Sequence, residues 1–126
     1  MRVAGEQIVS LPQDAVFRLF SDLERSGEYS KPVIERRKIT DGPVGAGTKY
    51  SALDQWPGKR VRFTVEISEY NEPHSLAARW SEPMAGGWHA RFLPEGNDTR
   101  LSFEATMELG GLLRALSPIL GLWAQR

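Results

Sequence analysis

Residues 109–126 read Leu109-Gly110-Gly111-Leu112-Leu113-Arg114-Ala115-Leu116-Ser117-Pro118-Ile119-Leu120-Gly121-Leu122-Trp123-Ala124-Gln125-Arg126, and this stretch decides the fold. Its large apolar side chains recur about every 3.6 residues, so a helix gathers them on one stripe: Leu112, Leu113, Leu116, Ile119, Leu120 and Trp123. Pro118 removes an internal hydrogen bond, so either a kink or a break between two short helices is expected near Leu116 or Ser117. A stripe this wide needs a partner surface from the rest of the chain.

Upstream of this helix, the chain consists mainly of short segments in which apolar and polar residues alternate. The clearest case has Val61, Phe63, Val65 and Ile67 on one face and polar side chains on the other, which is typical of a sheet with one solvated face. Similar alternation and intervening turn residues predict seven strands, over residues 3–9, 33–40, 48–56, 59–70, 76–80, 88–92 and 101–107.

A helix is expected between the first two strands. Ser10 and Gln13 have the spacing of a capping box, and Val16, Phe20 and their neighbours form an apolar face. Residues 24–32 are predicted to form a short second helix or a loop. The order strand, one or two helices, six strands and terminal helix predicts an α+β fold with an antiparallel sheet covering that helix.

The composition fits one globular domain spanning residues 1–126. Lys and Arg total 16 and Asp and Glu total 16, so no net charge attracts nucleic acid. Cysteine is absent, which excludes disulfides and thiolate chemistry. The first residues lack the apolar core of a signal peptide, and no apolar run has the length of a membrane span, so a cytoplasmic protein without membrane insertion is predicted.

Four local patterns resemble the helix-grip superfamily, which includes START domains, the major birch-pollen allergen and the polyketide cyclase/dehydrase (SRPBCC) group. They are the helix entry Ser10-Leu11-Pro12, the glycine-bearing loop of residues 41–47 followed by Thr48-Lys49-Tyr50, the pair Glu69-Tyr70 before Pro73, and the turn over residues 96–101. Two features depart from the family pattern: Tyr29 stands where many relatives carry tryptophan, and the terminal helix stops early.

This resemblance implies a curved seven-stranded antiparallel sheet wrapped around a long C-terminal helix, with one or two short helices after the first strand. It also implies an apolar cavity that takes a lipid, polyketide or isoprenoid-like molecule, and no single chemistry. The residues that we expect on the cavity wall are Tyr50, Phe63, Val65, Trp80, Trp88, Phe92, Phe103, Leu113, Leu116 and Leu120. The tryptophans are equally compatible with a ligand-binding aromatic box and with an ordinary core.

Polar side chains on the predicted inner face are few. Tyr50 and Asp54 are the catalytic candidates, and Glu35 and Arg37 are expected on the face of Val33. Such charges could hold a ligand group or simply neutralise each other at a sheet edge. The alternation places His89 on the solvent side, His74 falls in a turn, and the basic residues between Arg36 and Arg62 are expected on a solvated face.

The function that we predict is binding of a hydrophobic small molecule by a carrier or sensor. The first alternative is an enzyme of the polyketide aromatase/cyclase type, favoured if an inward polar pair exists. The second is an interaction module without ligand that forms a homodimer through the exposed end of its terminal helix. No cofactor is expected, and two histidines far apart in the chain do not indicate a metal site.

Overall fold

The computed structural model describes residues 2–82 and 84–107. Within them the chain forms an α-helix, a 3₁₀ helix and seven strands: α1 (Gln13–Ser21), η1 (Leu23–Glu28), β1 (Arg2–Val9), β2 (Val33–Lys38), β3 (Lys49–Trp56), β4 (Lys59–Asn71), β5 (Ser75–Trp80), β6 (Gly86–Glu95) and β7 (Asp98–Met107). The predicted terminal helix, with Leu113, Leu116 and Leu120 on its apolar stripe, lies outside the described residues.

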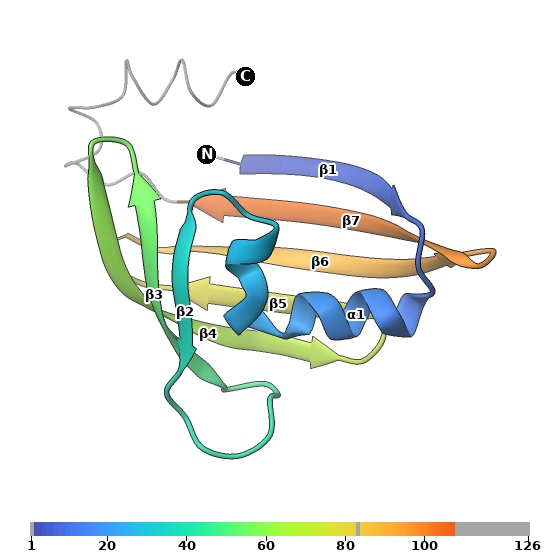
Figure 1. Ribbon diagram of the computed structural model, residues 1–126, viewed down its shortest axis with the longest axis horizontal. Coiled ribbons are helices and arrows are strands. Elements are labelled where there is room, and N and C mark those ends of the chain that lie inside the picture. The colour runs from blue at the N-terminus through green and yellow to red at the C-terminus, as the bar shows by residue number, and fades with distance from the viewer. Residues whose placement is uncertain (1, 83, 108–126) are drawn as a thin grey trace.

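The seven strands form one antiparallel sheet in the order β1-β7-β6-β5-β4-β3-β2, which confirms the predicted α+β fold with short helices after the first strand. Consecutive strands from β2 to β7 are neighbours, and β1 returns to pair with β7. Gly58 and Gly96 have φ angles of 82° and 63°, which a side chain would disfavour, and both lie in hairpin turns. Figure 1 shows the sheet curving around α1 and η1.

The helix α1 begins differently from the sequence prediction. Pro12 is its N-cap residue, and no side chain caps this end, so the predicted capping box of Ser10 and Gln13 is wrong. Gln13 is the first helical residue and is too early to act as the reciprocal partner of a cap. Its side-chain amide instead donates to the Phe92 carbonyl of β6 at 2.7 Å, which ties the start of the helix to the sheet.

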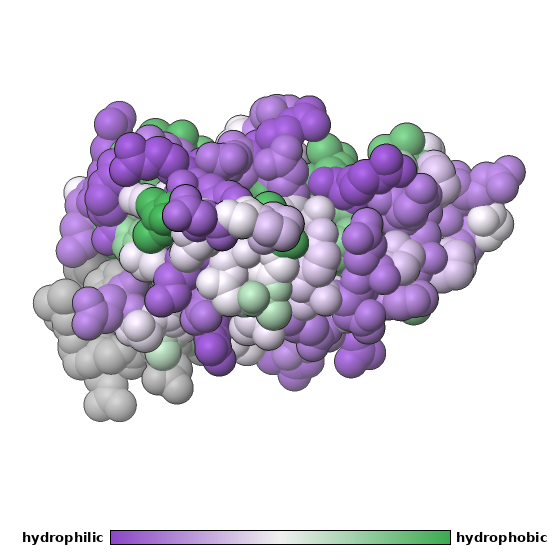
Figure 2. Space-filling model, turned by 90° about the horizontal axis from the view of Figure 1, so that it is seen from below, coloured by the Kyte–Doolittle hydropathy of each residue, from purple (hydrophilic) through white to green (hydrophobic). Residues whose placement is uncertain are grey.

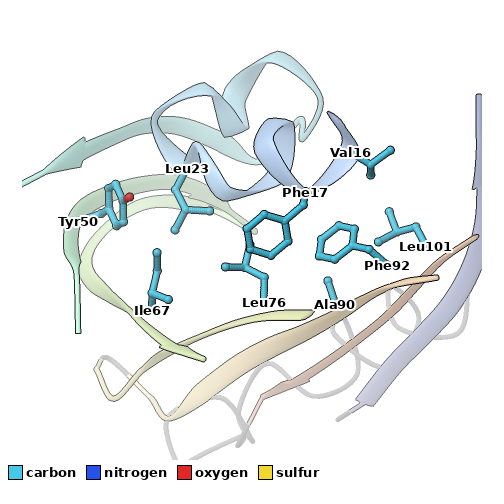
Figure 3. Close-up of a cluster of buried hydrophobic side chains, with 9 residues drawn as sticks. All are labelled: Val16, Phe17, Leu23, Tyr50, Ile67, Leu76, Ala90, Phe92 and Leu101. Carbon is cyan, nitrogen blue, oxygen red and sulfur yellow. The ribbon is translucent and has the colours of Figure 1, made fainter. Parts of the chain in front are cut away.

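The two helices cover different parts of the inner face. α1 packs on β5, β6 and β7, whereas η1 packs on β2 (Figure 1). Beneath α1 lies the helix-covered cluster, which comprises Val16, Phe17, Leu23, Tyr50, Ile67, Leu76, Ala90, Phe92 and Leu101. Figure 3 shows Phe17 pointing from α1 onto the sheet beside Leu76 and Phe92. Its ring meets those of Tyr70 and Phe92 edge to face, with centroids 5.2 and 5.4 Å apart.

A second apolar cluster consists of strand residues alone. This aromatic end comprises the buried residues Ala52, Val61, Phe63, Val65 and Ala78 with the partly buried Trp56, Trp80 and Trp88. The Phe63 ring contacts two indoles, with centroids 6.0 Å from Trp56 and 5.7 Å from Trp80. The inner face therefore has one half filled by a helix and another half built from strands β3 to β6.

The face seen in Figure 2 is mostly hydrophilic, with a paler central band and small, separated hydrophobic spots. Singly scattered apolar residues are normal on a protein surface and indicate no docking patch on this face. Within residues 2–82 and 84–107, no helix combines the length and apolar character needed to cross a membrane.

Candidate functional site

A β-bulge in β2 decides which charged residue faces the aromatic end. Val33 lies opposite Asp54 and Arg36 lies opposite Ala52, with a register shift between Val33 and Glu35. Because the bulge adds one residue, it exchanges the faces of the side chains that follow. The prediction that Glu35 and Arg37 face inward is therefore wrong, and Arg36 takes the inner position.

Arg36 and Asp54 form an ion pair that is largely shielded from solvent. Arg36 Nη1 lies 2.5 Å from Asp54 Oδ1 and Nη2 lies 3.2 Å from Oδ2, and each side chain is 12% exposed. The Arg36 Nη1 group also donates to the Glu35 carbonyl at 3.1 Å. This two-contact geometry is the strong form of an Arg–carboxylate interaction, so the guanidinium is held in one orientation.

The Arg36–Asp54 pair sits against an aromatic wall. Arg36 Cζ lies 5.5 Å from the centroid of Phe63, within the range of a cation–π contact. Trp80 also contacts the Phe63 ring, with centroids 5.7 Å apart, and lies opposite Gly86 in β6. A Cβ at Gly86 would come within 2.7 Å of the Trp80 ring, so the missing side chain allows the indole to lie directly on the backbone. The shielded Arg36–Asp54 pair therefore lies next to the aromatic side chains of the inner face.

Trp80 carries the second polar group of this region. Its Nε1–H is buried and finds no hydrogen-bond partner among the residues that the structure describes. Indole nitrogen only donates, and buried donors are nearly always satisfied, so an orphan of this kind requires an explanation. It lies on the inner face, in the same aromatic end as Phe63.

Tyr50 lies in the helix-covered cluster, near Leu23, and is 1% exposed. Burial raises the pKa of the Tyr50 hydroxyl to about 12, and the carboxylates of Glu24 and Asp22 add to the effect. The phenol is therefore neutral at physiological pH. A neutral phenol can donate a proton in a hydrogen bond but is a poor general base, which limits the role of this catalytic candidate.

The other predicted wall residues divide between the two halves of the inner face. Phe63 and Val65 are buried in the aromatic end, whereas Phe92 belongs to the helix-covered cluster. Trp88 packs against both clusters and stacks on Phe103, with ring centroids 6.2 Å apart. Phe103 is 39% exposed on β7. Leu113, Leu116 and Leu120 fall outside the described residues, and the role of the whole set in binding stays a prediction.

Sequence reasoning missed Arg36 because periodicity does not reveal a bulge. One signal pointed toward it: Asp54 stood as a carboxylate on an otherwise apolar face, and such a charge needs a cation. The adjacent run Glu35-Arg36-Arg37-Lys38 offered three cations, and only the register of β2 on β3 selects among them. Arg62, one of the basic residues expected on a solvated face, pairs there with Glu35 at 3.2 Å.

A cleft of about 360 Å³ lies on the outer face and is lined by Glu69, His74, Ser75, His89, Arg91 and Leu93. His89 occupies the solvent side, as predicted, and its Nε2 lies 3.1 Å from Glu69 Oε2. Ser75 donates to the same carboxylate, and these two hydrogen bonds lower the pKa of Glu69. Because Ser75 contacts the acid and not the imidazole, this cluster lacks the nucleophile–base contact of a hydrolase.

The curved antiparallel sheet with its short helices defines a START-like protein of the helix-grip class. Over residues 1–126 the chain matches the family described as polyketide cyclase / dehydrase and lipid transport, and it belongs to this family. Among curated proteins, none matches the chain.

Solved structures give the same fold. The protein TTHA0849 from Thermus thermophilus is 29% identical, with a TM-score of 0.75 over 95% of this chain and 86% of that one. A START superfamily protein from Mycobacterium smegmatis is 12% identical, with a TM-score of 0.73 over 98% and 92% of the two chains. The Zhui aromatase/cyclase from Streptomyces sp. R1128 is 15% identical, with a TM-score of 0.72 over 88% and 70%.

Proposed function

We propose that the protein binds a hydrophobic small molecule on the inner face of its sheet, as a carrier or sensor. The family to which it belongs joins polyketide cyclases and dehydrases with lipid transport, and all of these handle apolar molecules. The observation that carries the proposal is the aromatic end, where Phe63 and three tryptophans form an apolar surface from strands alone. Concave apolar surfaces with a few placed polar groups are typical of ligand sites.

The packing of the two halves supports a particular place for the ligand. Phe17 and Phe92 already fill the space under α1, and both are fully buried. Trp80 and Trp88 are only partly buried. We therefore place the ligand against Phe63, Val65, Trp80 and Trp88, with Tyr50 and Phe92 behind it as core. Leu113, Leu116 and Leu120 complete the proposed wall.

Native mass spectrometry of the purified protein, followed by organic extraction, tests this proposal. An apolar adduct at one-to-one stoichiometry is expected, or failing that, an increased melting temperature with a panel of lipids and polyketide analogues. Trp80→Ala should weaken binding, whereas Leu93→Ala on the outer face should not. A protein that carries no adduct and responds to no member of the panel would count against the proposal.

The Arg36–Asp54 pair favours a second candidate, an enzyme of the polyketide aromatase/cyclase type. An inward polar pair can orient a reactive carbonyl chain, and the aromatic wall can shape it. The test is the conversion of a linear poly-β-ketone surrogate to an aromatic product, followed by absorbance. Loss of turnover in Asp54→Asn, with ligand binding retained, would support the enzyme; no turnover by the wild type would exclude it for that substrate.

We further place the protein in the cytoplasm, without a nucleic-acid partner. A homodimer through the terminal helix is the remaining prediction, and the native mass spectrum reads its stoichiometry directly. Because the chain has equal numbers of acidic and basic residues, nothing in its net charge supports binding to nucleic acid.

A further inference from the structure

The cleft on the outer face (the outer cleft) exists because β5 carries small side chains between the longer ones of its two neighbouring strands. Ala77 lies between Glu69 of β4 and His89 of β6 in the register of the sheet. Ser75, the other small outward residue of β5, lies opposite Arg91. Because these side chains share one face of adjacent strands, they are close enough to contact one small ligand. The face is opposite the aromatic end, so this cleft is separate from the proposed ligand site.

The Glu69 carboxylate in this cleft is only partly used by the protein. Ser75 and His89 both bond to its Oε2 atom, whereas Oε1 accepts no hydrogen bond from any residue that the structure describes. The hydrogen bonds from Ser75 and His89, together with the charge of Arg91, lower the pKa of Glu69, so the carboxylate is ionised at neutral pH. The side chain is 47% exposed, and its Oε1 atom remains for a donor from outside the chain.

Arg91 supplies the opposite charge in the same cleft. Its guanidinium makes no hydrogen bond and no ion pair within residues 2–82 and 84–107, although it lines the cleft together with Glu69. A guanidinium offers N–H groups in the fork geometry that matches a carboxylate. Leu93, which is 46% exposed, adds an apolar side chain to the lining. The cleft therefore contains one cation and one anion that form no ion pair with each other, beside an apolar surface.

A ligand with a single charge would be matched poorly by this arrangement. A carboxylate bound to Arg91 would be repelled by the ionised Glu69, and an ammonium group bound to Glu69 would be repelled by Arg91. A molecule that carries both charges satisfies each group and adds no net charge to the cleft. An α-amino acid has its ammonium and carboxylate groups on one carbon atom, and an apolar side chain on that carbon can pack on Leu93.

We propose that the outer cleft is a binding site for a zwitterionic α-amino acid with an apolar side chain. Arg91 donates to the carboxylate, and Glu69 Oε1 accepts a hydrogen bond from the ammonium group. Ser75 and His89 hold Glu69 in position through its other oxygen. This site lies on the outer face and does not depend on the apolar ligand that we propose for the inner face.

Isothermal titration calorimetry at neutral pH and low salt tests this site with leucine, isocaproate and isopentylamine. The three compounds share a branched carbon chain, and isocaproate and isopentylamine each lack one of the two charged groups of leucine. The wild type should bind leucine with a Kd of about 1 mM or lower, and each singly charged compound at least about tenfold more weakly. Low ionic strength is needed because salt screens charges at an open cleft.

Two variants identify the partner of each charged group. Arg91→Gln removes the partner of the carboxylate, so leucine should bind about tenfold more weakly, at the level of isopentylamine. Glu69→Gln removes the partner of the ammonium group and the repulsion of anions, so leucine and isocaproate should bind equally well. Arg60→Gln is the matched control, because Arg60 is an exposed arginine of β4 that does not line the cleft. It should leave all three affinities unchanged.

The order of the three affinities decides whether the site exists. If the wild type binds leucine no more tightly than its singly charged analogues, or does not bind it at about 10 mM, the proposal is wrong. Equal losses in Arg91→Gln and Arg60→Gln would also overturn it, because the effect would then follow net charge and not the cleft. Thermal unfolding checks that each variant is folded. Arg91→Gln removes no hydrogen bond of the described residues, so it still tests the carboxylate contact if Glu69→Gln does not fold.

Discussion

The two halves of the inner face differ in what fills them. In the helix-covered cluster, α1 inserts Phe17 between Tyr70 and Phe92, and the three rings pack edge to face. In the aromatic end, strands alone supply the rings, and a shielded ion pair and an indole N–H without a partner in the described residues lie among them. The first half is built as a core is built, whereas the second retains polar groups that a core would normally exclude. Stability and binding should therefore depend on different residues.

The largest loss of stability is expected when a side chain of the helix-covered cluster is removed. Phe17→Ala removes a fully buried ring and leaves a cavity beneath α1, which should lower the free energy of unfolding by about 3–5 kcal/mol. Urea denaturation measures the loss, and Leu93→Ala serves as the exposed control. Phe63→Ala in the aromatic end should lower the free energy of unfolding less than Phe17→Ala does, and should weaken ligand binding more. Equal losses of stability would remove the distinction between the two halves.

The second-largest loss of stability is expected when one member of the Arg36–Asp54 pair is removed. Arg36→Met leaves the Asp54 charge shielded and uncompensated, so a loss of about 3 kcal/mol in the free energy of unfolding is expected. The double variant Arg36→Met/Asp54→Leu should recover most of that loss, because two apolar side chains replace two charges. A double-mutant cycle by urea denaturation measures the coupling. If the double variant is no more stable than Arg36→Met, the ion pair itself stabilises the fold, and its presence does not argue for a role in ligand binding.

The stability of the helix-covered cluster at alkaline pH depends on the ionisation of Tyr50. Burial raises its pKa from 10.0 to about 12, so its contribution to stability is fully present below pH 10 and is lost as the pH rises through about 12. The wild type should lose about 2 kcal/mol across this range beyond what Tyr50→Phe loses. Thermal unfolding at a series of alkaline pH values, with absorbance at the phenolate band, compares the two. Parallel curves would show that Tyr50 ionises like an exposed tyrosine.

The smallest effect is expected on the outer face, which serves as a reference for both halves. Hydrogen bonds from Ser75 and His89 lower the pKa of Glu69, so the stabilisation is present above the ordinary glutamate pKa of about 4.3 and disappears as the pH falls below it. Because the Glu69 side chain is 47% exposed, the difference from Glu69→Gln should stay below about 1 kcal/mol. Acid denaturation curves of the two proteins measure it; a larger difference would mean that the outer cleft contributes to the core.

Much of the fold was predictable because strand alternation is a direct consequence of burial on one face. The alternation of Val61, Phe63, Val65 and Ile67 predicts β4 and its inner face correctly, since each of these side chains is buried. Pro57-Gly58 likewise marks the hairpin between β3 and β4, where Gly58 takes a positive φ. Local rules suffice where local geometry and burial agree.

The polar part of the candidate site was harder to predict, because it depends on register and not on periodicity. The bulge in β2 exchanges the faces of Glu35 and Arg36, and the sequence carries no glycine or proline there to mark it. Gln13 shows the same limit: its side chain bonds to Phe92 across the fold and not to the helix start. Long-range contacts of this kind follow only from the assembled sheet.

The bulge in β2 also influences how the sheet meets other chains. β2 and β1 are the two edge strands of the described sheet, and an edge strand offers unpaired N–H and C=O groups to any strand that approaches. In β2 the bulge interrupts that row, and Ile34, at the bulge, is 42% exposed. β1 pairs with β7 through eight consecutive positions without a shift, so its other edge is regular and, within residues 2–82 and 84–107, has no neighbouring strand. Self-association by strand addition should therefore begin at β1 and be disfavoured at β2.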